Sequence, residues 1–239
     1  MSRCIAIAPE APQTDRLQEA VRVLQQGGVI AYPTDTVYGL AVDATNVTAI
    51  ARLFTAKQRP GDKAIPLIIG DMSQLSQVVA TIPLDAERLM QAFWPGPLTL
   101  LFEPQSGIPA ELRGSSACIG VRWPAALISQ HLACMLGRPI TATSANRSGA
   151  AVALTASQVM AQLSSTVDLI LDGGTASSTV VSTVLDVSVA PPRLLRAGKI
   201  SLQAVESVLG TPIGSVPMRH NNRLDNVLCP EDAESDRGE

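Results

Sequence analysis

The stretch AYPTDTVYGLAVD, residues 31–43, begins as an apolar strand and then gathers proline, threonine, aspartate, tyrosine and glycine within seven positions. Alone, this pattern is typical of a tight turn that leaves a buried strand. Polar groups at the end of a strand are also the usual lining of a ligand pocket in α/β proteins. Other parts of the chain must decide between these two interpretations.

Strand-like apolar runs alternate with segments of helical period along most of the chain. Thr14 or Asp15, Thr155 and Ser201 are the predicted helix caps, and residues 139–143 are predicted as one strand. Some neighbouring strands have connections too short for a parallel crossover. We therefore predict an α/β fold: a single-domain twisted mixed sheet, parallel and antiparallel, with flanking helices over residues 1–210, and a flexible, polar and acidic tail over 211–239.

The composition excludes several classes of protein. Of 239 residues, 46% are hydrophobic but only 3% aromatic, so the core must be mainly aliphatic. Residues 1–218 are formally neutral, which gives no general argument for nucleic-acid binding. Four scattered cysteines form no CxxC pair, and no run has the length of a signal peptide or a membrane span. We therefore expect a cytoplasmic protein.

Histidine and lysine are both scarce. Only two histidines are present, so chemistry based on a histidine nucleophile system or on several imidazole ligands is excluded. Two of the three lysines fall in AKQRPGDKAIPLII, residues 56–69, where Lys57 and Arg59 precede the stiff Pro60. This stretch is either a solvated charged loop or a site for a polyanion such as a triphosphate.

Further polar groups follow predicted strands. TATSANRSG, residues 141–149, offers hydroxyls, an amide and a glycine, although the chain has neither a GxxxxGK[ST] nor a GxGxxG motif. Arg122 in VRWP and Arg196 in LLRAG each end an apolar strand, and Ser182 and Thr183 lie within VVSTVLD. Each of these features alone has an ordinary structural explanation, as does FWPGPLTL (93–100), which is typical of packing around a rigid turn.

Taken together, the ordered motifs resemble the YrdC/Sua5 family of threonylcarbamoyl-AMP synthases over about residues 15–210. They are YPTDTVYGL, KxRP with PL, WPGPLT, VRWP, SANRSG, STVLD and LLRAG. The resemblance implies a twisted mixed sheet with a concave, electropositive face. It also implies that L-threonine, bicarbonate or CO2, and ATP give threonylcarbamoyl-AMP and pyrophosphate. A downstream transferase complex then modifies adenosine 37 of ANN-decoding tRNAs.

The resemblance assigns roles to matching positions. For L-threonine these are Thr34, Arg122, Ser144 and Ser182. For ATP they are Lys57, Arg59, Asn146 and Arg196. Second-rank residues are Tyr38, Ser148 and Thr183. Mg²⁺ is expected to arrive with ATP without a protein-bound metal site, and Asp35 and Asp43 are only weak candidates for direct ligands.

The chain departs from many relatives at four places. Ile69-Gly70 replaces a histidine, Ala125-Ala126 replaces His-Pro, Val181 replaces a glutamate and Thr143 replaces a proline. The short segment after the core resembles the short, TsaC-like form. Two rival interpretations are a double-stranded RNA-binding or ribosome-associated module, and a carbamoyl-transfer domain of hydrogenase-maturation proteins. The neutral body and the lack of acylphosphatase-like and zinc-finger segments argue against them.

Overall fold

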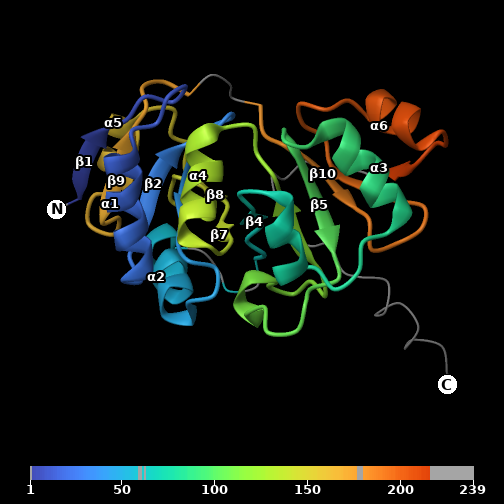
Figure 1. Ribbon diagram of the computed structural model, residues 1–239, viewed down its shortest axis with the longest axis horizontal. Coiled ribbons are helices and arrows are strands. Elements are labelled where there is room, and N and C mark those ends of the chain that lie inside the picture. The colour runs from blue at the N-terminus through green and yellow to red at the C-terminus, as the bar shows by residue number, and fades with distance from the viewer. Residues whose placement is uncertain (1, 59–60, 62, 177–179, 216–239) are drawn as a thin grey trace.

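The computed structural model describes residues 2–58, 61, 63–176 and 180–215, and it confirms a mixed α/β fold (Figure 1). The helices are α1 (Thr14–Gln25), α2 (Val47–Lys57), α3 (Leu84–Phe93), α4 (Leu127–Leu136), α5 (Ala156–Leu163) and α6 (Leu202–Leu209), with 3₁₀ helices η1 (Met72–Gln77) and η2 (Ala110–Leu112). None of the described helices is long and apolar enough to cross a bilayer.

The strands form two hydrogen-bonded sheets rather than one continuous ladder. The five-stranded sheet has the order β1 (Arg3–Ala6), β9 (Leu169–Asp172), β2 (Ile30–Pro33), β3 (Tyr38–Ala41), β8 (Thr143–Ser144). The seven-stranded sheet has the order β12 (Gly214–Ser215), β11 (Arg193–Arg196), β10 (Thr183–Asp186), β5 (Leu98–Phe102), β6 (Ile119–Arg122), β4 (Leu67–Ile68), β7 (Ile140–Thr141). Both sheets mix parallel and antiparallel pairs.

The two sheets meet at the segment predicted as one strand over residues 139–143. The structure splits it, because β7 pairs with β4 in one sheet and β8 pairs with β3 in the other. Ala142 lies between them, and its amide donates to the Pro66 carbonyl at 2.7 Å. The Thr141 amide donates to the Val42 carbonyl at 3.1 Å. One short segment therefore serves both sheets and couples their positions.

Helices cover the sheets through two aliphatic cores. α1 and α4 lie side by side against β2 (Figure 1) and bury residues such as Leu24 and Leu132. The larger core holds β5 and side chains of the remaining α-helices, and α3 lies beside α6. Apolar burial of this extent supplies the main driving force for folding.

The N-cap residues of the helices can be compared with those predicted from the sequence. Thr155 Oγ1 accepts from the Gln158 amide and Ser201 Oγ from the Ala204 amide, each at 3.2 Å, so both predicted caps are confirmed. The prediction of a cap at Thr14 or Asp15 is wrong. The cap position is Gln13, whose side chain instead accepts from the Ala8 amide at 3.0 Å.

The beginning of the predicted tail takes part in the fold. Gly214–Ser215 forms β12 beside β11, and the Ile213 amide donates to Glu206 Oε1 at 3.1 Å. Ile213 is also buried in the larger core. Residues 211–215 thus close the edge of the seven-stranded sheet, and residues 216–239 lie outside the described part of the chain.

Gly198 lies against the backbone at the start of β10. A Cβ atom there would stand 2.4 Å from the Ser182 carbonyl carbon and from the Thr183 nitrogen, which are backbone atoms that cannot move aside cheaply. We expect Gly198→Ala to lower the free energy of unfolding by about 1–3 kcal/mol in urea denaturation. The matched control is Gly214→Ala, where an added Cβ meets nothing within 4 Å. Equal stability of both variants would contradict this close approach.

Candidate functional site

Several predicted site residues lie at the ends of strands, and the hydrogen-bonded pairing of these strands brings the ends close together. β6 and β11 are antiparallel to β5 and β10, so Arg122 and Arg196, which end their strands, lie where β5 and β10 begin. In the five-stranded sheet, β2 ends and β3 begins around the Thr34–Val37 turn. The contacts described below join these edges.

Arg122 is the centre of this junction. Its Nη2 donates to both carboxylate oxygens of Asp35, at 2.7 and 2.5 Å, and its Nε donates to the Gly96 carbonyl at 2.9 Å. Burial lowers the pKa of Arg122 below its usual value, and the charge of Asp35 opposes that shift. The guanidinium predicted to bind a substrate carboxylate is therefore already fixed by a carboxylate of the protein.

Arg196 is a second, partly buried guanidinium group near Arg122. Its Nε and Nη2 donate to the Ser182 carbonyl at 3.1 and 2.9 Å, and Nη2 also lies 2.9 Å from Ser182 Oγ. Burial, followed by the charge of Arg122, lowers the pKa of Arg196 to about 10, so it stays protonated near neutral pH. Among the described residues, Arg196 has no carboxylate partner.

Charge around the junction is unbalanced. Lys199 Nζ donates to the Asp35 carbonyl at 3.1 Å, which adds a third cation beside Arg122 and Arg196. Asp35 is the carboxylate that pairs with this group. An excess of positive charge in a partly buried place favours anionic ligands.

The SANRSG segment forms a loop held from inside by Lys57. The Lys57 ammonium, 1% exposed, donates to the carbonyls of Ser144 and Asn146, the latter at 2.9 Å. Ser144 Oγ donates to Asn146 Oδ1 at 2.5 Å, and Asn146 Nδ2 donates to the Ala150 carbonyl at 2.6 Å. In this structure Lys57 orders the loop, and its predicted contact with ATP phosphates stays a prediction, as does that of Arg59, which lies outside the described residues.

The turn residue Thr34 is bonded within its own turn. Its Oγ1 donates to the Val37 carbonyl at 2.6 Å and accepts from the Thr36 amide at 3.1 Å. These bonds fix the neighbouring Asp35, so the turn supports the junction whether or not Thr34 also contacts a substrate.

Two of the three second-rank residues donate hydrogen bonds to backbone carbonyl groups. The Tyr38 hydroxyl donates to the Gly174 carbonyl at 2.7 Å, and burial raises its pKa to about 12. Thr183 Oγ1 donates to the Ile200 carbonyl at 2.8 Å. Ser148 Oγ is buried without a partner among the described residues. Tyr38 and Thr183 are thus occupied structurally, whereas Ser148 keeps an unused hydroxyl.

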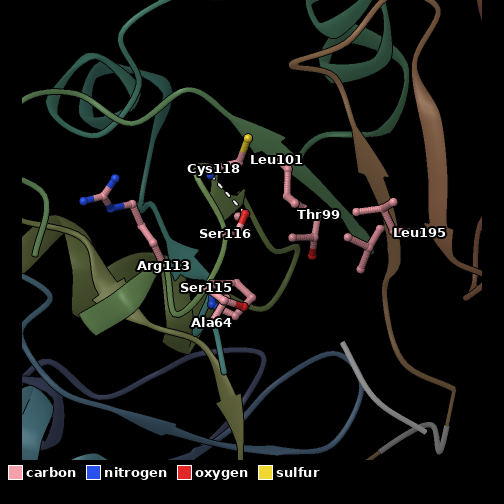
Figure 2. A pocket seen from close by; sticks show the side chains of 11 residues that line it. Ala64, Thr99, Leu101, Arg113, Ser115, Ser116, Cys118 and Leu195 are labelled. Carbon is pink, nitrogen blue, oxygen red and sulfur yellow. Dashed lines mark hydrogen bonds between the residues drawn. The ribbon is translucent and has the colours of Figure 1, made fainter. Parts of the chain in front are cut away.

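An open hollow lies beside β5, and Figure 2 shows Thr99, Leu101 and Leu195 among the side chains that line it. Apolar side chains of β5, β10 and β11 line it, together with hydroxyls and one guanidinium: Leu101, Val184, Leu195, Thr99, Ser115, Ser116 and Arg113. Thr99 Oγ1 lies 3.0 Å from Ser182 Oγ, so a lining residue of the hollow contacts a residue of the junction. An apolar space with a few hydroxyl groups and the guanidinium of Arg113 suits an organic anion.

Metal ligands are scarce at this place. No group of three or more histidine, cysteine, aspartate or glutamate side chains that could hold a metal occurs within the described ranges. Asp43 is 2% exposed, accepts from Thr45 and pairs with Arg138 at 2.9 Å. Asp35 is held by Arg122. Both carboxylates thus have protein partners in this structure, and the expectation that Mg²⁺ arrives with ATP stays a prediction.

Three groups that form the junction around Arg122 were not predicted from the sequence. Asp35 was weighed only as a metal ligand, and Lys199 and the Gly96 carbonyl were not considered. Tyr32, whose buried hydroxyl has no partner among the described residues, also lies near the ion pair: burial raises its pKa, Arg122 lowers it and Asp35 raises it. The position of Asp35 between two threonines of the opening stretch was the only available signal.

Known proteins match this chain in sequence. The Sua5/YciO/YrdC family model, described as "Telomere recombination", matches residues 22–198. A threonylcarbamoyl-AMP synthase of Pyrococcus abyssi is 37% identical over 90% of this chain, and the chain spans only 63% of that relative's length. A threonylcarbamoyl-AMP synthase of Vibrio cholerae is 40% identical over 68% of this chain and 87% of its own.

Solved structures match in fold. P. abyssi Sua5 complexed with L-threonine has a TM-score of 0.86 at 36% identity, covering 90% of this chain and 63% of that one. Escherichia coli YciO has a TM-score of 0.78 at 29% identity, covering 86% of this chain and all of that one. With a family match over most of its length and a shared fold, this chain belongs to the Sua5/YciO/YrdC family.

Proposed function

We propose that this protein is an L-threonylcarbamoyladenylate synthase, which converts L-threonine, bicarbonate or CO2, and ATP into threonylcarbamoyl-AMP and pyrophosphate. The observation that carries the proposal is the pair of neighbouring guanidinium groups, buried Arg122 and partly buried Arg196, where the two sheets meet. Relatives named threonylcarbamoyl-AMP synthase support it.

The reaction needs positioning more than a protein nucleophile. The amino nitrogen of threonine forms a bond to the carbon of CO2 and loses a proton, giving a carbamate. A carbamate oxygen then attacks the α-phosphorus of ATP, and the bond to the bridging oxygen breaks as pyrophosphate leaves. Orientation of bound reactants can contribute about 7–11 kcal/mol to such steps. The scarcity of histidine agrees with this chemistry.

Each ligand has a matching part of the site. Arg122 is suited to the carboxylate of threonine, and the hollow beside Leu195 is suited to the nucleoside. Arg196 lies near enough to Arg122 for their charges to interact, and cationic donors there would stabilise charge on the phosphates. Mg²⁺ is proposed to accompany the phosphates of ATP, because this ion often binds through substrate phosphates.

The product is proposed to serve tRNA modification in the cytoplasm. A mixed anhydride of a carbamate and a phosphate is reactive, so a downstream transferase complex would take it up to modify adenosine 37 of ANN-decoding tRNAs. Direct binding of double-stranded RNA or tRNA is the competing proposal if synthesis fails.

Pyrophosphate release tests the proposed reaction. Purified protein with ATP, Mg²⁺ and bicarbonate should release pyrophosphate when L-threonine is added, more than with L-serine or with no amino acid. Mass spectrometry should find threonylcarbamoyl-adenylate. No release under any condition would contradict the proposal, and double-stranded RNA would then be the next ligand to measure.

Arg196→Gln should lower kcat/KM for ATP by about a hundredfold, because a charge-assisted donor to phosphate is lost in a buried place. Arg88→Gln is the matched control, since Arg88 is exposed on α3 and pairs with Asp85. Steady-state kinetics with ATP as the varied substrate measures the effect. If the two variants had equal kcat/KM for ATP, Arg196 would not be part of the nucleotide site.

Lys57→Met separates two roles of the lysine. Without the ammonium, the Ser144 and Asn146 carbonyls lose a charged donor, so we expect the free energy of unfolding to fall by about 1–3 kcal/mol and synthesis to fall with it. Thr48→Met, at an exposed position of the same helix, is the control. A Lys57→Met protein of unchanged stability but lost activity would favour phosphate binding alone.

A further inference from the structure

The Asp35–Arg122 pair leaves one nitrogen atom of the guanidinium group, Nη1, available to a ligand. Asp35 engages only Nη2, and Gly96 engages Nε. Nη1 makes no hydrogen bond to any described residue, yet it is not among the enclosed atoms that lack a partner. The pair therefore presents a solvent-accessible donor directly beside a carboxylate.

Asp35 is held in place independently of any ligand. Its carbonyl accepts from Lys199, and the turn on either side is closed by the hydrogen bonds of Thr34. Its side chain keeps 19% exposure. A carboxylate has about four lone-pair sites, and Arg122 is the only partner of these two oxygens among the described residues, so acceptor capacity remains.

A donor and an acceptor side by side match the two charged groups of an α-amino acid, which one carbon atom separates. We infer that Asp35 binds the amino group of the amino-acid substrate whose carboxylate the proposed function places on Arg122. This inference rests on the proposed function and extends it, because it makes Asp35 the residue that selects amino acids over other carboxylic acids. Asp35 stays on Arg122 and is not displaced.

Binding of two ligands to the full-length protein tests this role. L-threonine carries both charged groups, and (R)-β-hydroxybutyrate is the same molecule without the amino group. Dissociation constants measured by chemical-shift perturbation should rise about tenfold or more for L-threonine in Asp35→Asn, since a charge-assisted hydrogen bond is lost. The constant for (R)-β-hydroxybutyrate should change by less than about threefold.

Two further variants complete the design. Asp35→Glu keeps the charge and should retain a preference for L-threonine over (R)-β-hydroxybutyrate, and it serves if Asp35→Asn does not fold. Asp85→Asn removes a carboxylate paired with Arg88 on α3 and should leave both constants unchanged.

Contrary outcomes are distinct. Tighter binding of both ligands to Asp35→Asn would mean that Asp35 competes with the substrate carboxylate, and equal weakening of both would mean that it only positions Arg122. Loss of the preference in Asp35→Glu would also overturn the inference. Wild-type protein that binds neither ligand would contradict the proposed function itself.

Discussion

The ion pair between Asp35 and Arg122 joins the edges of two sheets, and the arrangement of the site depends on it. Asp35 belongs to the turn after β2 in one sheet, and Arg122 ends β6 in the other. A mostly buried guanidinium needs a partner, because desolvation disfavours its charge. The pair thus fixes the turn against the seven-stranded sheet, and Lys199 reinforces it through the Asp35 carbonyl.

The remaining site follows from this junction. Arg196 lies close enough for the charge of Arg122 to lower its pKa, and Thr99 and Ser182 connect it to the hollow. On the opposite sheet, the loop at Ser144 follows β8, which pairs with β3 directly after the Asp35 turn. Fixed cations and hydroxyls in a partly buried place can stabilise transferred phosphate without a nucleophilic side chain.

The sequence was sufficient for the fold class, and the roles that it suggests for the site residues stay predictions. Arg122, Ser182 and Arg196 lie in motifs whose order alone identified the family, and the structure brings all three together. The contacts of Asp35 could not be predicted, because its partner lies 87 residues away and only sheet pairing brings them together. The local sequence around Lys57 suggested either a solvated loop or a polyanion site, and neither alternative foresaw its burial against carbonyls of a distant loop. The split of residues 139–143 likewise depends on two partner strands that the segment itself does not reveal.

A crystal structure with L-threonine and a non-hydrolysable ATP analogue tests the central claim most directly. The account predicts the threonine carboxylate on Arg122, the phosphates near Arg196 and the nucleoside in the hollow beside Leu195, with Asp35 still paired to Arg122. Nucleotide bound elsewhere on the molecule, or an amino acid that makes no contact with Arg122, would contradict it.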